Sequence, residues 1–373
     1  MTAPLLLTPG PLTTSDDVRA AMTVDWGSRD PVFVAMSDEV RATVATLAGP
    51  ADQVVCVPVQ GSGTFAVEAT IGTLLPRDGR LLVLVNGAYG HRMVQIARTL
   101  GRSVTAYEWA EDAPVDPAQV DALLAADAAI THVAVVFCET TTGILNPLRE
   151  IAAVVARHGR RLLIDAMSAF GALPLTLADV PFDAVMASSN KCLEGVPGIG
   201  FVIVRREVLA VCKGNSHSVA LDLYDQATRF EKDGQWRFTP PTHVLAALHA
   251  AIVAHRAEGG VAGRGARYLE NRDILMAGMR ALGFQTLLPD ALQAPIIITF
   301  LQPGSASYEF ERFYDALRRR GFAIYPGKLT VADTFRVGCI GQVFPDDIRR
   351  FLVAVREAMN ELGMTDGAAV TVE

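Results

Sequence analysis

Short apolar runs alternate with longer helical stretches through the middle of this chain. The runs occupy residues 54–59, 81–85, 104–109, 133–137, 162–164, 184–186 and 201–204. Most successive positions in each run are apolar, which is typical of strands that helices cover on both faces. Because strands and helices alternate, the pattern predicts a mainly parallel α/β sheet between two layers of helices.

The helical stretches have recognisable boundaries. Residues 88–100 and 147–158 are expected to form crossover helices, the second with Asn146 as its N-cap and Pro147 at its first position. A longer helical stretch covers residues 242–282. Gly259 and Gly260 are expected to interrupt it.

The two ends of the chain differ from its middle. Thr8-Pro9-Gly10-Pro11 is dense in turn-forming residues, so the first dozen residues are expected to form an arm. The last third contains an apolar run, a helix, a short strand and a final helix, at residues 296–300, 308–320, 322–325 and from Asp346. We therefore predict an N-terminal arm at 1–15, a large domain at 16–255 and a smaller C-terminal α+β domain at 256–373, with the arm packed nearby.

Composition narrows the class of protein. The 373 residues are 50% hydrophobic, enough to bury a large core in two domains. A formal charge of −7 gives no electrostatic support for nucleic acid or an anionic membrane as a partner, so a small molecule is expected. Five dispersed cysteines without a C-x-x-C pair argue against disulfides and a zinc site, and no apolar run is long enough to span a membrane. We expect a soluble cytoplasmic protein without a metal.

Lys191 is the first candidate for chemistry. It is one of only four lysines, and it follows the apolar run 184–186 and precedes a glycine-rich segment. An amine at the end of a strand can be partly desolvated, which lowers its pKa toward the range in which it forms a Schiff base. A solvated surface lysine is the alternative that position alone leaves open.

Asp165 ends the apolar run 162–164 and lies 26 residues before Lys191. A carboxylate at the carboxyl edge of a parallel sheet points into the crevice where ligands bind. Beside a pyridoxal phosphate (PLP) ring, it would keep the ring nitrogen protonated. A helix N-cap or a surface ion pair is the alternative for an isolated Asp165, but its spacing from Lys191 favours the cofactor role.

The segment Gly61-Ser62-Gly63-Thr64 follows the run 54–59 and precedes a helical stretch. Glycines admit an anion close to the backbone, hydroxyls donate to it, and a helix N-terminus attracts it, so this segment is a candidate phosphate site. Together with Ala66, the segment also matches the G-x-G-x-x-A motif of NAD-dependent dehydrogenases. That motif requires an acidic residue at the end of the next strand to bind the ribose, but here the next strand ends in Asn86-Gly87. A plain glycine turn is the remaining alternative.

Three further features have weaker signals. Ser188-x-x-Lys191 matches one motif of penicillin-recognising hydrolases, but the chain lacks their S-D-N and K-T-G motifs. Tyr89 follows a predicted strand and could stack on a flat cofactor, or simply pack. Arg336 interrupts an apolar context, where it could bind a carboxylate or phosphonate through two hydrogen bonds, or form a surface ion pair.

Several short motifs, taken in their order along the chain, resemble those of a known family. They include Asn-Gly-Ala-Tyr-Gly at 86–90, Glu-Thr-Thr-Thr-Gly at 139–143, Asp-Ala-Met-Ser at 165–168, Ser-Asn-Lys-Cys at 189–192 and Tyr-Pro-Gly-Lys at 325–328. Over nearly its whole length the chain resembles the class V branch of fold-type I PLP enzymes, and within it the 2-aminoethylphosphonate:pyruvate aminotransferases. The resemblance implies a large α/β/α sandwich domain and a smaller α+β domain.

The resemblance also implies roles for individual residues. Lys191 would form the Schiff base with PLP and move the proton between substrate and cofactor, and Asp165 would pair with the ring nitrogen. Thr141 would bond the phenolic oxygen of the ring, and Tyr89 would stack on it. The cofactor phosphate would be held by Ser62, Gly63 and Thr64, with Thr239 reaching across from the second subunit of a homodimer, and Arg336 would bind the acidic group of the substrate.

The implied reaction transfers the amine of 2-aminoethylphosphonate to pyruvate and gives phosphonoacetaldehyde and L-alanine. Arg29 departs from the pattern of the family, as either a second substrate-binding cation or a partner of Asp25 or Asp30. An alanine–glyoxylate or serine-type class V aminotransferase, acting on a carboxylate donor, is therefore the main alternative. A PLP-binding regulator without turnover is a further one, although the chain has no basic DNA-binding extension.

Overall fold

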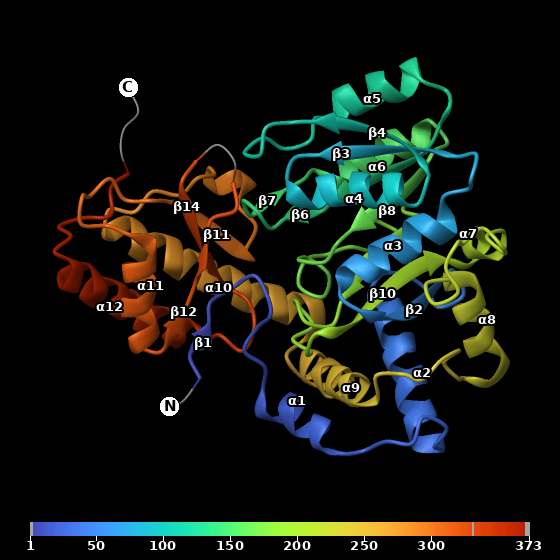
Figure 1. The fold of residues 1–373 in the computed structure, drawn as a ribbon, viewed down its shortest axis with the longest axis horizontal. Coiled ribbons are helices and arrows are strands. Elements are labelled where there is room, and N and C mark those ends of the chain that lie inside the picture. The colour runs from blue at the N-terminus through green and yellow to red at the C-terminus, as the bar shows by residue number, and fades with distance from the viewer. Residues whose placement is uncertain (1–2, 330–331, 370–373) are drawn as a thin grey trace.

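The computed structural model describes residues 3–329 and 332–369. Figure 1 shows a body built around a central sheet and a smaller body formed mainly by the last third of the chain. No helix among the described residues is long and apolar enough to cross a membrane. The domain boundaries at residues 15 and 255 stay predictions.

A seven-stranded sheet forms the larger body. In spatial order the strands are β2 (Val54–Gly61), β10 (Gly198–Arg205), β9 (Ala184–Ser188), β8 (Arg161–Asp165), β5 (Ile130–Val136), β3 (Arg80–Val85) and β4 (Ser103–Glu108). Strand β10 is antiparallel to both of its neighbours, and every other neighbouring pair in this sheet is parallel. The prediction of a mainly parallel α/β fold is confirmed.

The sheet is buried on both faces because alternate residues of each strand enter different cores. Leu82 and Leu84 face one hydrophobic core, and Leu81 and Val83 face the other. Helices α3 (Gly63–Leu74) and α4 (Ala88–Thr99) contribute to the second core, and α2 (Pro31–Thr46), α5 (Pro117–Ala126), α6 (Leu148–Arg157) and α9 (Thr242–Ala257) contribute to the first. Strand β4 was expected to be buried on both faces, but this edge strand is partly exposed along its length.

The smaller body has its own core. Strands β11 (Ile297–Leu301), β14 (Thr334–Gly338) and β13 (Tyr325–Pro326) form an antiparallel sheet, packed with α10 (Gly260–Ala281), α11 (Phe310–Arg319) and α12 (Pro345–Leu362). In the arm, β1 (Leu5–Leu6) pairs with β12 (Phe322–Ala323), and Leu7 enters this core. The strand predicted at 322–325 is therefore divided between two sheets.

Two local predictions have different outcomes. Gly259 and Gly260 have φ values of 98° and 67°, which end α9 and begin α10, so the predicted break is confirmed. The predicted start of α6 was wrong by one residue, because the helix begins at Leu148 with Pro147 in the capping position. The side-chain amides of Asn146 and Asn86 instead bond each other, with Asn86 Nδ2 donating to Asn146 Oδ1 at 2.9 Å and Asn146 Nδ2 donating to Asn86 Oδ1 at 3.1 Å. These bonds join the end of β3 to the segment before α6.

Candidate active site

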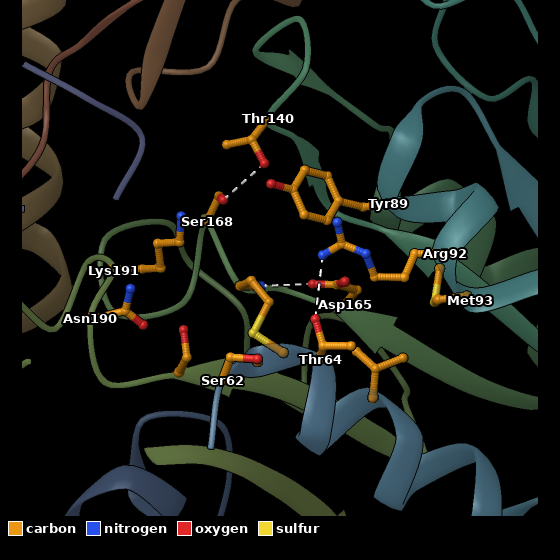
Figure 2. Close-up of a pocket in the computed structure, with 14 residues that line it drawn as sticks. Ser62, Thr64, Tyr89, Arg92, Met93, Thr140, Asp165, Ser168, Asn190 and Lys191 are labelled. Atoms are coloured by element: carbon orange, nitrogen blue, oxygen red, sulfur yellow. Dashed lines mark hydrogen bonds between the residues drawn. The ribbon is translucent and has the colours of Figure 1, made fainter. Parts of the chain in front are cut away.

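A cavity of about 220 Å³ lies at the carboxyl ends of β8 and β9, beside the start of α3 (Figure 2). Ten of its lining residues carry the argument below: Ser62, Gly63, Thr64, Tyr89, Arg92, Thr140, Asp165, Met167, Ser168 and Lys191. The six predicted site residues Ser62, Gly63, Thr64, Tyr89, Asp165 and Lys191 are therefore brought together. The carboxyl edge of a parallel sheet is where such folds place ligands.

Lys191 follows β9 after a two-residue turn, and its amine lies against the N-terminal arm. Lys191 Nζ donates a hydrogen bond to the carbonyl of Pro9. Burial lowers the pKa of the Lys191 amine to about 8, although the nearby Cys192 and Asp165 act in the opposite direction. The amine is therefore held at the wall of a cavity rather than in bulk solvent, and a substantial fraction is neutral near physiological pH.

Asp165 ends β8, and its side chain is buried. Oδ1 accepts a hydrogen bond from the Met167 N–H at 3.0 Å. Burial raises the pKa of the Asp165 carboxyl to about 6, while the Met167 hydrogen bond and the charges of Arg92 and Lys191 lower it. Asp165 forms no ion pair with another residue that the structure describes, and a buried carboxylate of this kind is suited to face a cationic group of a ligand.

The start of α3 opens into the cavity. Ser62 is its N-cap residue, but no side chain caps the helix, and Thr64 Oγ1 accepts from Arg92 Nη1 at 3.3 Å. A Cβ at Gly63 would lie 2.4 Å from Met167 Sδ, so the side chain of Met167 packs directly against the glycine at the start of the helix. Backbone N–H groups, two hydroxyls and one guanidinium thus surround a site suited to a phosphate.

Arg92 was missed from the sequence. It extends from α4 toward Thr64, and its guanidinium lies 4.9 Å from the centre of the Tyr89 ring. The signal was present, because residues three apart in a helix share a face, and Arg92 follows Tyr89 by three.

Thr140, Ser168 and Glu139 were also missed. Thr140 and Ser168 line the cavity, and the Ser168 hydroxyl donates to Thr140 Oγ1 at 3.4 Å. Thr141 is not among the lining residues, and its hydroxyl donates to the buried Glu139 Oε1 at 3.0 Å. Burial raises the pKa of the Glu139 carboxyl to about 7. Only the folded turn between β6 (Cys138–Glu139) and β7 (Ile144–Leu145) determines which of the adjacent threonines faces the cavity.

Arg336 lies in β14 of the smaller body and is only 6% exposed. Its Nη1 donates to the Thr140 carbonyl at 3.1 Å and its Nε donates to the Pro326 carbonyl at 3.1 Å. Burial lowers the pKa of Arg336. It thus lies next to the cavity wall, which Thr140 forms, rather than at the surface.

Arg29 and Thr239 lie elsewhere, in a surface pocket that they share with Arg229 and Arg237. Among the described residues, Arg29 forms no ion pair with Asp25 or Asp30. Asp30 instead accepts from the Val32 N–H at 2.8 Å, and Asp25 lies 3.0 Å from His243. Within one copy of the chain, neither Arg29 nor Thr239 lines the cavity that contains Lys191.

Comparison with known proteins identifies the family. The model of the aminotransferase class V family matches residues 27–338. The chain belongs to the class V aminotransferases. Enzymes of this class depend on PLP, so the family prediction and the cofactor prediction are both confirmed.

Several relatives of this class V aminotransferase are similar over nearly their whole length. A 2-aminoethylphosphonate–pyruvate transaminase of Pseudomonas fluorescens (strain Pf0-1) is 56% identical over 98% of this chain and 99% of its own. One from Burkholderia ambifaria (strain MC40-6) is also 56% identical, over 98% of each chain. The solved structure of pyridoxamine–pyruvate aminotransferase from Mesorhizobium loti is 25% identical, with a TM-score of 0.89 over 97% of this chain and 93% of that one.

The cavity of this class V aminotransferase has the chemical groups that PLP requires. The amine of Lys191 can react with the aldehyde of PLP, and the buried carboxylate of Asp165 can face its ring nitrogen. The glycine-containing start of α3 can bind its phosphate. Among the described residues, no group of three or more histidine, cysteine, aspartate or glutamate side chains could hold a metal ion. The residues present thus fit the cofactor of the family.

Proposed function

We propose that this class V aminotransferase transfers the amine of 2-aminoethylphosphonate to pyruvate and gives phosphonoacetaldehyde and L-alanine. The observation that carries the proposal is its 54–56% identity, across 97–98% of the chain, to relatives that bear this activity in their names. The cavity supports the same reaction class, because an amine and a carboxylate line one cavity.

PLP, when bound, withdraws electrons from the substrate carbon that carries the amine. We expect Lys191 to hold the cofactor covalently and Asp165 to face its ring nitrogen. Ser62, Gly63 and Thr64 would hold the phosphate, and Arg92 is added here because it bonds the Thr64 hydroxyl. Tyr89 would stack on the ring.

Either of two threonines can contact the phenolic oxygen of the PLP ring. Thr141 stays the residue that the family resemblance implies, and Thr140 is the one whose side chain lines the cavity. The bond from Thr141 to Glu139 leaves its oxygen free to accept but engages its proton. We therefore include Thr140 as the alternative contact.

Lys191 is also the proposed base. Its pKa of about 8 leaves part of the amine neutral at pH 7 to 8, and general bases are most effective when their pKa lies near the working pH. The same side chain would then take the proton from the substrate carbon and deliver it to the cofactor. Asp165, which is buried and aprotic when ionised, orients the ring but has no proton to exchange.

Arg336 is the proposed contact of the substrate's acidic group, because its guanidinium is buried beside Thr140 at the cavity wall. Arg29 is proposed as a second cation. At neutral pH a phosphonate carries more negative charge than a carboxylate, so a site with two arginines favours the phosphonate donor.

A homodimer is part of the proposal. Arg29 and Thr239 line a pocket separate from the cavity of their own copy, so they would act on the cavity of a second copy. The exposed aromatic residues Phe65 and Phe238, at 47% and 53% exposure, line an adjacent apolar groove, and such patches commonly mark protein interfaces. Sedimentation of the purified protein tests this point, because a monomer would leave Thr239 without a role.

A cytoplasmic location is also proposed. The five cysteines are all free and buried, which suits a reducing compartment.

The decisive experiment is visible spectroscopy of the protein reconstituted with PLP. Adding 2-aminoethylphosphonate should replace the band of the lysine-bound cofactor with that of the pyridoxamine form, and pyruvate should restore the first band with formation of L-alanine. A band that responds to L-alanine or L-serine but not to 2-aminoethylphosphonate would instead assign the protein to the carboxylate-donor alternative.

A further inference from the structure

The turn that carries Lys191 ends at a residue with an uncommon backbone conformation. Among residues 3–329 and 332–369, Glu194 is the one residue other than glycine with positive φ, at 61°. Its N–H donates to the Lys191 carbonyl at 2.7 Å, and the Gly195 N–H donates to the Ser189 carbonyl at 2.8 Å. Because this conformation is disfavoured for glutamate, the surrounding contacts must hold it.

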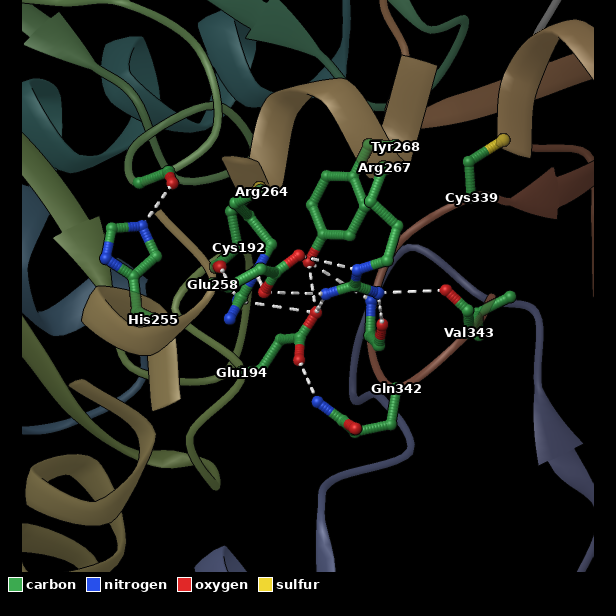
Figure 3. Close-up of polar contacts among 12 residues, drawn as sticks. Cys192, Glu194, His255, Glu258, Arg264, Arg267, Tyr268, Cys339, Gln342 and Val343 are labelled. Carbon is green, nitrogen blue, oxygen red and sulfur yellow. Dashed lines mark hydrogen bonds and ion pairs between the residues drawn. The ribbon is translucent and has the colours of Figure 1, made fainter. Parts of the chain in front are cut away.

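The carboxylate of Glu194 is buried and receives hydrogen bonds from three side chains (Figure 3). Oε1 accepts from Arg267 Nη2 at 2.7 Å and from the Tyr268 hydroxyl at 2.5 Å, and Oε2 accepts from Gln342 Nε2 at 2.6 Å. Arg267 and Tyr268 lie in α10, whereas Gln342 lies between β14 and α12. One carboxylate therefore joins the Lys191 turn to two segments of the smaller body.

Arg264 makes a second connection to the same turn. Its Nη1 donates to the Cys192 carbonyl at 2.6 Å and lies 3.3 Å from Glu194 Oε1, and its side chain is 1% exposed. Glu258 bonds both Arg264 and Arg267, so two carboxylates balance two guanidinium groups. Loss of one partner from such a buried cluster destabilises the protein, because the other partner is left as an uncompensated buried charge.

Because of these contacts, we infer that Glu194 is a positioning residue for Lys191. The carboxylate holds the turn from Lys191 to Glu194 in the conformation that projects the amine into the cavity. Since α10 and Gln342 bind the same carboxylate, a displacement of the smaller body relative to the sheet is transmitted to the amine. The inference rests on the proposed function only for the choice of substrate.

A purely structural role is the competing explanation, and three variants separate the two. Glu194→Gly removes the carboxylate but accepts the positive φ without strain. Tyr268→Phe removes one hydrogen-bond donor and keeps the ring. Asn271→Ala is the matched control, because Asn271 is a buried residue of the same helix whose side chain donates to the Cys339 and Val343 carbonyls rather than to the Lys191 turn.

The main readout is the rate at which PLP enters the apo-protein as a function of pH, followed by the visible band. Incorporation requires a neutral amine in the correct place. With a looser turn the amine is more hydrated, so the apparent pKa of incorporation should rise toward the ordinary lysine value, and incorporation should slow near pH 7.5. We expect kcat to fall by about tenfold to a hundredfold in Glu194→Gly while KM for the amino donor changes little.

Tyr268→Phe should change the same quantities in the same direction but less, and Asn271→Ala should lower thermal stability alone. The inference is overturned if Glu194→Gly keeps the wild-type incorporation profile and kcat and loses only stability. If Glu194→Gly does not fold, an unchanged incorporation profile in Tyr268→Phe overturns it instead. Failure of 2-aminoethylphosphonate as a donor would count against the proposed function alone, because incorporation of PLP is measured without substrate.

Discussion

Lys191 Nζ donates a hydrogen bond to the carbonyl of Pro9, a residue that precedes it by 182 positions. The N-terminal arm therefore lies against the amine, which is the most reactive group of the cavity. Gly10, the next residue, has φ +116°, and a Cβ there would lie 2.7 Å from Lys191 Nζ. The close approach of the arm to the amine depends on the absence of a side chain at this position.

Gly10→Ala is expected to displace the Lys191 amine. Turnover should fall by about tenfold or more, because a misplaced reactive group loses its productive geometry. The matched control is Gly321→Ala, since Gly321 also has positive φ, at 88°, but a Cβ there would meet nothing within 4 Å. Both variants should lose about 1 kcal/mol or more of stability, measured by urea denaturation. Equal turnover in the two variants would show that the arm does not position the amine.

Lys191→Ala should abolish turnover and PLP incorporation without loss of stability at neutral pH. The pKa of Lys191 is about 8 in the folded protein and near 10.5 when unfolded, so its charge opposes folding increasingly as pH falls from 10.5 to 8. Removing the amine therefore relieves up to about 3 kcal/mol at pH 7, which offsets the lost packing. Urea denaturation of the apo-proteins at pH 7 and 10.5 measures this effect, and the exposed Lys213→Ala is the control. If Lys191→Ala clearly lost stability at pH 7 but not at pH 10.5, the predicted sign of the charge effect on folding would be contradicted.

Asp165→Asn should inactivate the enzyme and yet stabilise the apo-protein above pH 6. Burial raises the pKa of Asp165 to about 6, so the ionised carboxyl opposes folding progressively as pH rises from about 4 to about 6. Asparagine keeps an oxygen for the Met167 N–H and carries no charge, and the expected gain is up to about 3 kcal/mol at pH 7.5. Denaturation curves should converge near pH 4. A stability difference that does not change with pH would show that the effect is not electrostatic.

Arg92→Met should weaken PLP binding rather than chemistry. Loss of a charged donor beside Thr64 is expected to raise the Kd of the apo-protein for PLP by about tenfold to a hundredfold. At saturating PLP, kcat should recover most of its wild-type value. Arg98→Met provides the control, because Arg98 is an exposed arginine at the end of the same helix. An unchanged Kd would exclude Arg92 from the phosphate site.

The strands were predictable because the information for each is local. Residues 81–85 are apolar at successive positions, and a strand buried on both faces requires this pattern wherever it lies in the sheet. The position of each strand is not local. Strand β10 is antiparallel to β2 and β9, and no periodicity within residues 198–205 distinguishes it from its parallel neighbours.

The site residues divide in the same way. Lys191, Asp165 and the turn at Ser62 could be singled out because each combines a chemical group with the end of a predicted strand or the start of a helix, and the ordered motifs led to the family. Sequence alone did not show whether Thr140 or Thr141 faces the cavity. That choice depends on the turn between β6 and β7 and on Glu139, whose burial comes from the packing of several elements.

Composition, periodicity and ordered motifs thus determined the layers of the fold, the family and the chemistry of the Lys191 and Asp165 pair, because each is encoded in short segments. Only the tertiary structure decided which groups surround that pair. Pro9 reaches Lys191, Arg336 reaches the Thr140 carbonyl, and Gln342 reaches Glu194 across separations of 182, 196 and 148 residues. The physical reason is that burial and hydrogen bonding, which shift the pKa values and fix the turns, arise only when distant segments exclude water together.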